Sequence, residues 1–446
     1  MIKKLFITIA LLLLLWPSLG WAAIYYVDTT TGDDEDTGLS EALAWQTITH
    51  VNAASFNADD QILFKCGETW TLQGGLEPPS SGTSGHPIIF GSYGEGAKPI
   101  INASTSGDEA LLLSGGISYV TVQDIDFTCT QSHVVFFGNA SYCIVDNIEA
   151  HGSTVGAGIA GNDGAGENHH NTVKNSNAYG QTWEGIYFCN ITADNLTHDI
   201  TIENNESHDN GYECVQMTFH GSGTIGPAGS IVSGNKLYNC GDTGHIQVQG
   251  DVVIEYNELY GTGGSLGGVF VDSNSDGTVI IGNVIHDIAV NSANPIAGIR
   301  LADATVTNTL MYNNTIYKVN NAGAGVGRGF TTNASGATNL FKNNIVSECD
   351  NQITWNAPGP TADTNVVYGS SDETGTNAIT TAPLFTNAAG DDFTLQAGSP
   401  CRNAGVYLPG YESKLKWTST WPDGVLLMDD ILSIGAYAVP RGAAGM

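Results

Sequence analysis

Hydrophobic and polar residues alternate at the period of a β-strand in segments that return roughly every 22 to 31 residues, a spacing that suits one coil of a β-solenoid. Four copies read VVIEYNELYG (252–261), TVIIGNVIHD (278–287), TLMYNNTIYK (309–318) and NLFKNNIVSE (339–348). One copy cannot bury its own apolar face, so successive copies are expected to stack. The pattern predicts an all-β fold, a single-stranded parallel β-helix with capped ends, in which Ile254, Ile281 and Met311 point into a shared core.

Asparagine recurs at the same point of six copies: Asn205, Asn235, Asn257, Asn283, Asn314 and Asn344. Asparagine tolerates the left-handed conformation of a tight corner, and stacked amides can hydrogen-bond between coils about 4.8 Å apart. These positions predict an asparagine ladder.

Three positions after each ladder asparagine come ring-bearing side chains, namely His208, Tyr238, Tyr260, His286 and Tyr317. We expect these rings to stack and stiffen the outer wall, with a sugar-binding strip as the alternative.

The charge of the chain excludes some partners. Its 446 residues carry a formal net charge of −31, from 14 basic and 45 acidic side chains. This excess argues against nucleic acid and against unaided binding to anionic lipid, and it disfavours polyanionic glycans unless calcium bridges the contact.

The ends of the chain suggest export and capping. Residues 1–22 have a basic start, an apolar run and small residues near Ala22, which predicts a signal peptide. No later segment is apolar and long enough to cross a membrane, so we expect a secreted, periplasmic or cell-surface protein. The remaining divisions that we expect are an N-terminal cap with the first coils (23–116), central repeats (117–370) and a C-terminal cap (371–446).

The eight cysteines show neither a disulfide-scaffold spacing nor a C-x-x-C metal pattern. Cys129 with Cys143, or Cys189 with Cys214, are candidate pairs across neighbouring coils. Buried free thiols are the alternative.

Segments at both ends carry a family resemblance. YYVDTTTGDD (25–34) and AWQTITHVNA (44–53) near the start, and APLFTN (382–387) and GSPCRNAG (398–405) near the end, resemble secreted right-handed parallel β-helix proteins of the pectate-lyase-like superfamily. With the coils, the resemblance covers nearly all of the mature chain. It implies a right-handed helix with a substrate groove along the first strand of each coil. It leaves the activity open, because the superfamily includes lyases, hydrolases, epimerases and phage tailspikes.

The first strands are expected where a strand follows each variable loop, in EGIYFCN, ECVQMTF, GHIQVQG, GGVFVDS and AGIRLAD. Alternation places five apolar side chains inward: Ile186, Val215, Ile246, Val269 and Ile299. It places two columns outward, one of Tyr187, Gln216, Gln247, Phe270 and Arg300, the other of Cys189, Thr218, Gln249, Asp272 and Ala302. Rings stack on sugars and amides bond hydroxyls, so the predicted substrate-binding residues are Tyr187, Gln216, Gln247, Gln249 and Phe270. Polar outward residues are also what any solvated sheet shows.

Glu184 and Glu213 precede their strands at the same point of neighbouring coils, and His245 is nearly in line one coil further. Two carboxylates about 5 Å apart repel, so one keeps its proton to higher pH, as a general acid requires. The spacing resembles a retaining glycosidase pair, and splayed side chains would give an inverting one. The alternative is that both glutamates point into water.

Arg300 and Asp272 form a second candidate constellation, on adjacent coils and offset by two residues. In the superfamily that the chain resembles, an arginine on this face removes a proton beside a uronate carboxylate. Calcium held by Asp272, Asp276 and Asp303 would then assist an elimination. A structural salt bridge between Arg300 and Asp272 is the simpler interpretation.

His169 and His170 fall in an irregular loop, and an adjacent histidine pair does not easily face one metal. We therefore expect loop residues there and assign no metal site.

Two classes of function remain open. One is an enzyme on an extracellular polysaccharide, which hydrolyses without a cofactor or, with Arg300, acts as a calcium-assisted lyase or an epimerase. The other is a non-catalytic glycan-binding, adhesion or envelope protein.

Overall fold

The computed structural model describes residues 22–71, 74–104, 108–164, 166–191, 196–219, 226–241, 243–333, 338–355, 359–406 and 435. The predicted signal peptide, apart from Ala22, lies outside these residues, as does most of the predicted C-terminal cap beyond residue 406. No described helix is both long enough and apolar enough to span a membrane.

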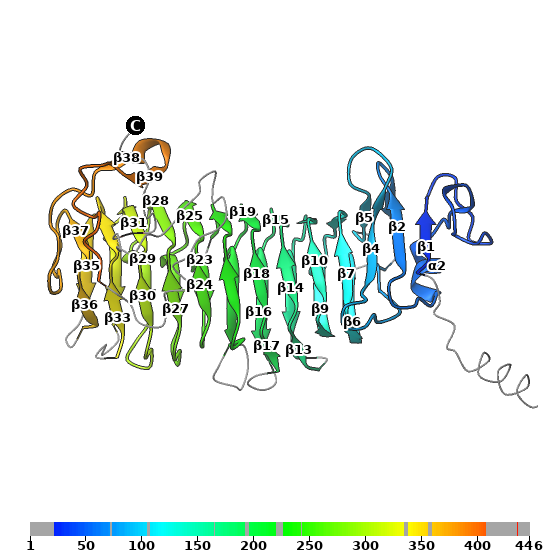
Figure 1. Ribbon diagram of the computed structural model, residues 1–446, viewed down its shortest axis with the longest axis horizontal. Coiled ribbons are helices and arrows are strands. Elements are labelled where there is room, and N and C mark those ends of the chain that lie inside the picture. Colours follow the sequence, from blue (N-terminus) through cyan, green and yellow to red (C-terminus); the bar gives the residue numbers. More distant parts are fainter. Residues whose placement is uncertain are drawn as a thin grey trace, which may run out of the picture.

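Three long parallel sheets run along the molecule, and most coils contribute one strand to each sheet (Figure 1). Sheet A consists of β1 (Ile24–Val27), β2 (Gln61–Lys65), β4 (Ile88–Tyr93), β7 (Val120–Gln123), β10 (Ile144–Asp146), β14 (Thr172–Lys174), β18 (Thr201–Glu203), β21 (Ile231–Ser233), β24 (Val253–Glu255), β27 (Val279–Ile281), β30 (Leu310–Tyr312), β33 (Leu340–Lys342) and β36 (Thr361–Asp363). Sheet B consists of β3 (Thr69–Thr71), β5 (Ile100–Asn102), β8 (Asp126–Thr128), β11 (Glu149–His151), β15 (Asn177–Tyr179), β19 (Glu206–His208), β22 (Lys236–Tyr238), β25 (Glu258–Gly261), β28 (Val284–Val290), β31 (Thr315–Asn321), β34 (Ile345–Ser347) and β37 (Val366–Tyr368).

Sheet C carries the strands that were predicted to line a groove. It consists of β6 (Leu111–Ser118), β9 (Val135–Ser141), β12 (Ile159–Asn162), β13 (Asn168–His169), β16 (Ile186–Asn190), β17 (Thr197–His198), β20 (Val215–Phe219), β23 (Gly244–Val248), β26 (Gly267–Val271), β29 (Ile296–Leu301), β32 (Gly327–Thr332) and β35 (Asn351–Trp355). The predicted all-β parallel β-helix is confirmed. Outside the three sheets the structure describes a short helix α2 (Ile48–Ala53), 3-10 turns η1 (Glu41–Leu43) and η2 (Ala388–Gly390), and a hairpin of β38 (Phe385–Asn387) and β39 (Asp392–Leu395).

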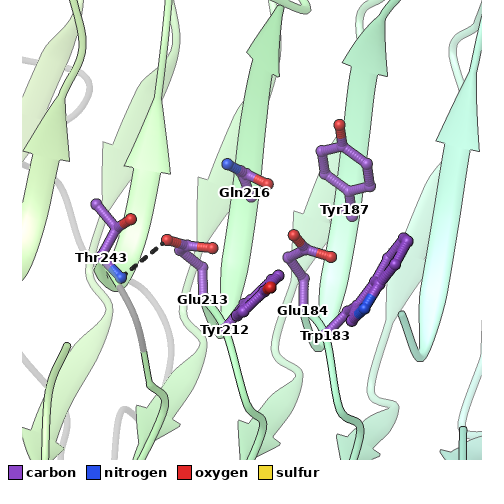
Figure 2. Close-up of a pocket in the computed structure, with 7 residues that line it drawn as sticks. All are labelled: Trp183, Glu184, Tyr187, Tyr212, Glu213, Gln216 and Thr243. Atoms are coloured by element: carbon purple, nitrogen blue, oxygen red, sulfur yellow. Dashed lines mark hydrogen bonds between the residues drawn. The ribbon is translucent and has the colours of Figure 1, made fainter. Parts of the chain in front are cut away.

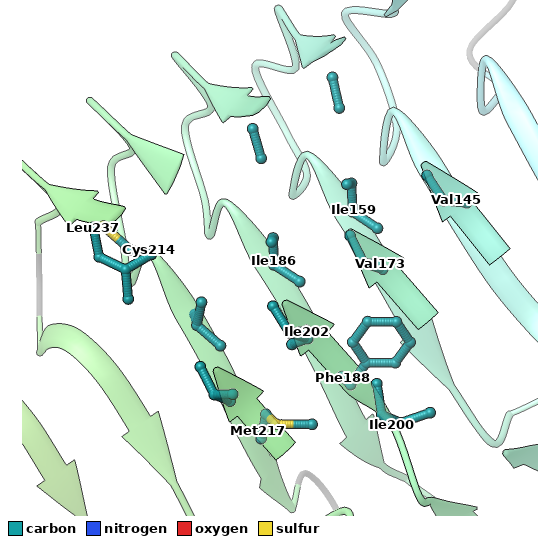
Figure 3. Packing of buried hydrophobic residues seen from close by; sticks show 14 of the residues in the cluster. Val145, Ile159, Val173, Ile186, Phe188, Ile200, Ile202, Cys214, Met217 and Leu237 are labelled. Atoms are coloured by element: carbon teal, nitrogen blue, oxygen red, sulfur yellow. The ribbon is translucent and has the colours of Figure 1, made fainter. Parts of the chain in front are cut away.

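Apolar side chains from all three sheets fill the interior of the stack (Figure 3). The sheet C register aligns the five residues predicted to point inward, and all of them are buried: Ile186, Val215, Ile246, Val269 and Ile299. On sheet A, Ile254 and Met311 also point inward, as expected, but the residue aligned between them is Ile280. The inward assignment of Ile281 is therefore wrong.

Ile281 is buried for a different reason. It aligns with Glu255 and Tyr312 on the outer side of sheet A, where it packs in a small apolar cluster with Val279 and with Val406 from the C-terminal segment. Because Val406 covers the outer side of sheet A here, the outward-facing Ile281 lies in an apolar environment. A one-residue slip in register exchanges the two faces of a strand, and the apolar run Val279–Ile281 hides which face is which.

The asparagine ladder runs along the turn from sheet A to sheet B. Each ladder amide donates from Nδ2 to Oδ1 of the next one, over 2.9–3.1 Å, through Asn205, Asn235, Asn257, Asn283, Asn314, Asn344 and Asn365. The predicted ladder is confirmed, with Asn365 as a further member. The left-handed corner residue is the one before each ladder position, for example Asn204 at φ 55° and Tyr256 at φ 59°. Ladder asparagines are thus selected for their amides, and their neighbours for the corner.

The predicted ring stack is present on sheet B from His208 to His286, whereas Tyr317, also predicted to belong to it, contacts Phe393 edge-on instead. Rings follow one another at centroid distances of 4.7–5.3 Å along His151, Tyr179, His208, Tyr238, Tyr260 and His286. Beyond His286 the stack meets Phe393 of the hairpin β38–β39, which folds back over the outer side of sheet B (Figure 1). The stack lies on a different wall from sheet C, so it takes no part in a groove there.

One disulfide joins neighbouring coils, between Cys214 and Cys240, whose Cα atoms are 5.4 Å apart. The predicted pairings of Cys129 with Cys143 and of Cys189 with Cys214 are wrong. Cys129, Cys143 and Cys189 are buried free thiols, which was the alternative.

Candidate functional site

Glu184 and Glu213 occupy equivalent positions of adjacent coils. The register Ile186 to Val215 joins β16 to β20, and the Gly185 amide donates to the Glu213 carbonyl over 2.9 Å just before the strands begin. Neighbouring strands of a sheet lie about 4.8 Å apart, which places the two glutamate backbones side by side. Both side chains are well shielded from water, with 6% and 2% of their surface exposed.

The two glutamates line a pocket at the start of the sheet C strands (Figure 2). Its walls come from three successive coils: Trp183, Glu184, Tyr187, Tyr212, Glu213, Gln216 and Thr243. Trp183 and Tyr212 directly precede the glutamates and remain 39% and 40% exposed. Their rings therefore stand beside the carboxylates while keeping a free face toward solvent. The expectation that both glutamates simply point into water does not hold.

The electrostatics of the pocket are those of a shielded acidic site. The backbone amide of Thr243 donates to Oε1 of Glu213 over 3.2 Å, which stabilises the ionised carboxylate. Burial raises the pKa of the Tyr187 phenol, and the neighbouring Cys189 and the two glutamates act in the same direction. Burial likewise raises the pKa of the Cys189 thiol to about 12. Both groups therefore stay protonated at neutral pH, and the Tyr187 hydroxyl offers a hydrogen bond at the pocket.

The first outward column on sheet C continues away from the pocket as a hydrogen-bonded row. Tyr187 aligns with Gln216, and Gln216 with Gln247, as predicted. The Gln216 amide donates to Oε1 of Gln247 over 3.0 Å, and the Gln247 amide donates to Oδ2 of Asp272 over 3.0 Å. These bonds fix the orientation of Gln216 at the pocket edge. Phe270 follows Gln247 in the column and lies outside the pocket lining.

Gln249 has a structural role. Its Oε1 accepts from the Phe219 amide over 3.0 Å and its Nε2 donates to the Ser273 carbonyl over 2.8 Å. The side chain is 9% exposed and bridges the backbones of two neighbouring coils. Its predicted place in substrate binding is therefore not supported, because both ends of the amide are engaged by the protein.

His245 does not lie at the pocket. The register places Gly244, not His245, opposite Glu213, so the imidazole falls on the inward face and is fully buried. Its Nε2 lies 2.8 Å from the Tyr260 carbonyl and its Nδ1 3.2 Å from the Gly267 carbonyl. Burial lowers the pKa of His245 to about 4. The predicted catalytic role fails for the same one-residue reason as the inward assignment of Ile281.

Arg300 and Asp272 diverge. The Arg300 guanidinium donates from Nη1 to the Pro295 carbonyl over 3.4 Å, at the opposite end of its strand from Asp272. Among the described residues no ion pair joins the two, so the predicted salt bridge is wrong. Burial, together with the nearby charge of Arg328, lowers the pKa of Arg300.

The three aspartates proposed for calcium are each engaged by hydrogen bonds from the protein, and Asp272 and Asp303 both accept from Ser273. Asp272 accepts from Gln247, Asp276 accepts from Thr307 and Asn308, and Asp303 accepts from Ser273 and Thr305. The described part of the chain brings at least three potential metal ligands together in two other places, one of them around His170 and His198. The carboxylates of the predicted calcium set do not converge.

Trp183, Tyr212 and Thr243 were not predicted as site residues. The aromatic residues could have been found, because an aromatic–glutamate dipeptide occurs at 183–184 and again at 212–213, one coil later. Thr243 contributes its backbone amide, which no side-chain pattern reveals.

Comparison with known proteins supports the fold. A family model described as a right handed beta helix region matches residues 191–346. The solved structure of the PL6 family alginate lyase AlyGC is 14% identical with a TM-score of 0.53, over 94% of this chain and 58% of that chain. The chain is a right-handed parallel β-helix. The predicted handedness and the resemblance to the pectate-lyase-like fold are confirmed.

A curated relative is a lacto-N-biosidase of Bifidobacterium longum, 27% identical over 128 residues, a match that covers 23% of this chain and 8% of the relative. A GH136 lacto-N-biosidase structure from Eubacterium ramulus is 15% identical with a TM-score of 0.44, over 80% of this chain and 68% of that one. The β-helix therefore spans a small part of its curated relative. The sequence comparison and the structure comparison both include proteins whose names are those of glycan-active enzymes.

Proposed function

We propose that this β-helix hydrolyses a glycosidic bond of an extracellular glycan, with Glu184 and Glu213 as the catalytic pair. The observation that carries the proposal is the placement of two shielded carboxylates at equivalent positions of adjacent coils, inside a pocket with aromatic walls. Shielded, paired carboxylates are the machinery of glycoside hydrolysis. The sequence match to a lacto-N-biosidase supports the same class of chemistry.

The strand spacing favours a retaining mechanism. Carboxyl groups of retaining enzymes lie about 5–5.5 Å apart, close to the spacing of about 4.8 Å between neighbouring strands. Glu213, whose carboxylate accepts the Thr243 amide, attacks the anomeric carbon as the nucleophile. Glu184 gives its proton to the departing glycosidic oxygen. It then takes a proton from the water that cleaves the glycosyl–Glu213 ester, which returns both residues to their starting states.

The pocket walls indicate a neutral sugar. Trp183 and Tyr212 offer exposed rings for stacking on pyranose faces, and Gln216 offers an oriented amide for hydroxyl groups. Two carboxylates and a net charge of −31 would repel a uronate. The inter-coil disulfide Cys214–Cys240 supports export, because disulfides persist in oxidising compartments.

A lyase centred on Arg300 is the second candidate. The lowered pKa of this guanidinium suits a base. Against it, the acidic residues that would bind calcium beside a uronate do not converge on Arg300.

The test is an activity screen of the chain without residues 1–22 on neutral and uronic-acid oligosaccharides, with and without calcium. Reducing ends without ultraviolet absorbance support hydrolysis. Absorbance from unsaturated products that disappears when a chelator is added would contradict hydrolysis and support the calcium-assisted lyase. In the hydrolysis case Glu184→Gln and Glu213→Gln should each lower kcat by about 10³-fold or more.

Glu203→Gln is the matched control, since Glu203 lies on the outer wall of sheet A in the same coil as Glu213 and outside the pocket. It should retain full activity. Full activity in Glu213→Gln would contradict the proposal, and silence on every glycan, with the fold intact, would favour a binding or structural protein.

A further inference from the structure

The turn from sheet C to sheet A brings three histidines together, away from the pocket. At this turn two consecutive residues of four successive coils align with their counterparts, so two columns form along the corner. The first column contains Ser141, His169, His198 and Ala228. The second contains Tyr142, His170, Asp199 and Gly229, all at left-handed φ values of 51–66°. Two neighbouring coils therefore place His169 and His170 directly beside His198 and Asp199.

Three side chains converge at this corner. Nδ1 of His198 lies 2.7 Å from Oδ2 of Asp199, and Nε2 of His170 lies 3.7 Å from the same oxygen. One ligand atom from each of the three residues falls within 4.8 Å of the others. A tetrahedral ion with bonds of about 2.0–2.1 Å needs its ligand atoms about 3.3 Å apart. Small side-chain rotations reach that spacing, because these groups are partly exposed.

The far nitrogen of each imidazole already has its own partner. Nε2 of His198 lies 3.3 Å from Oε1 of Glu167, and Nδ1 of His170 lies 2.8 Å from Nδ1 of His169. Metal-binding histidines characteristically use one nitrogen for the ion and give the other to a carboxylate or similar acceptor, which fixes the tautomer and the ring orientation. The His198 ring is also held by stacking on His169, with centroids 5.1 Å apart and planes 6° from parallel.

The next coil leaves one side of the cluster open. A pocket here is lined by His198, Asp199, Ala228 and Gly229. After His198 the first column continues with alanine, and after Asp199 the second continues with glycine. A Cβ on Gly229 would lie 2.5 Å from Oδ1 of Asp199. Glycine at this position keeps the carboxylate free to turn and leaves room for a solvent ligand.

We propose that His170, His198 and Asp199 bind a divalent transition-metal ion of the zinc type, with Glu167 and His169 as positioning residues. Two imidazoles and one carboxylate form a ligand set that favours zinc over calcium or magnesium. The ion joins two consecutive coils at their corner. The adjacent pair His169–His170 does not chelate the ion, in agreement with the sequence-based objection. His170 supplies one ligand, and His198 and Asp199 of the next coil supply the other two.

This site is separate from the proposed hydrolase. The pocket precedes the strands of sheet C, whereas the histidine corner follows them, and a strand such as β16 of five residues spans about 17 Å. The ion is therefore expected to act on the stability of these coils and not on the reaction.

The test measures zinc in the chain without residues 1–22, made without a histidine tag, stripped with chelator and then incubated with zinc chloride. We expect one zinc per chain after gel filtration. His170→Ala and His198→Ala should each weaken binding by about 100-fold or more in competition with a chromophoric chelator, and Glu167→Gln by about 10-fold. Zinc should also raise the melting temperature of the wild type but not that of His198→Ala.

His208→Ala is the matched control. His208 and Asp209 repeat the local geometry of His198 and Asp199, with Nδ1 2.8 Å from Oδ2 and a left-handed aspartate, but tyrosines flank the histidine in its stack. Zinc binding in this variant should equal that of the wild type. Equal zinc binding in His198→Ala and His208→Ala would overturn the proposal. So would a wild-type stoichiometry far below one zinc per chain.

Discussion

In the coils from Asn205 onward the turn from sheet A to sheet B is short and repeats, whereas the turn from sheet B to sheet C is longer and varies. The first consists of a left-handed residue and a ladder asparagine, as in Asn204–Asn205 and Tyr256–Asn257. The second runs from the end of β15 at Tyr179 to the start of β16 at Ile186, and carries Trp183 and Glu184.

The difference lies in how each turn satisfies its polar groups. A ladder asparagine bonds to its own copies on both sides, so a change in one coil leaves its neighbours with unpaired groups. The turn into sheet C begins with side chains that bond between coils, since Gln181 accepts from the Ser153 amide and Asn210 from the Gln181 amide. Closer to the strands the bonds join backbone atoms, such as the Gly185 amide and the Glu213 carbonyl. Trp183 lies between these two regions, is not a copy in a continuous side-chain ladder, and can carry chemistry. The repeated turn stabilises the fold, and the variable turn is where a site can arise.

The most severe test of this division is Ile280→Asp. Ile280 is fully buried in the main core, and an aspartate there would have no partner for its charge. We expect a loss of more than about 4 kcal/mol in the free energy of unfolding, seen as loss of the cooperative transition in chemical denaturation. Ile281→Asp disturbs only the outer cluster beneath the C-terminal segment and should cost less. The reverse order would show that the register of sheet A is wrong.

Asn257→Ala removes one member of the ladder. Its Nδ2 donates to the Val232 carbonyl and to Asn283, and its Oδ1 accepts from Asn235. Leaving these buried partners unpaired should cost about 3 kcal/mol. Glu184→Gln, in the variable turn, should change the free energy of unfolding by less than about 1 kcal/mol while abolishing activity. A ladder variant as stable as the wild type would erase the distinction between the two turns.

How far the sequence predicts each turn follows from the same division. The ladder, the ring stack and the inward column of sheet C were predicted because identical contacts repeat in every coil and leave a periodic pattern. His245 and Ile281 were misplaced by one residue. His245 was aligned with Glu213, although the register sets Gly244 there, and the apolar run Val279–Ile281 hides which of its residues face the core. The His170–His198 pairing was missed because it depends on two irregular corners adopting the same left-handed turn.

Trp183→Ala probes the variable turn without touching the carboxylates. Loss of a stacking ring should raise KM about 10-fold, with kcat and the melting temperature nearly unchanged, since the indole is 39% exposed. Tyr368→Ala is the control, because Tyr368 is similarly exposed, at 37%, but lies in the last strand of sheet B, many coils away from the pocket. An equal effect of both variants on KM would mean that sugar does not stack on Trp183.

The smallest expected effect belongs to an ion pair on the partly exposed outer wall of sheet B, between His151 and Asp126. A hydrogen bond of 2.9 Å between Nε2 of His151 and Asp126 raises the pKa of His151, against the opposing effect of burial. A raised pKa in the folded state means that the stabilisation is complete below the unfolded value of about 6.5 and is lost as pH rises through the folded value. His151→Gln should therefore lower stability by about 0.5–1 kcal/mol at pH 5.5 and by less at pH 8.5, measured by denaturant unfolding at both pH values. A difference that grows with pH would show that His151 is held as the neutral ring in the stack, and that even this wall is built by stacking and not by charge.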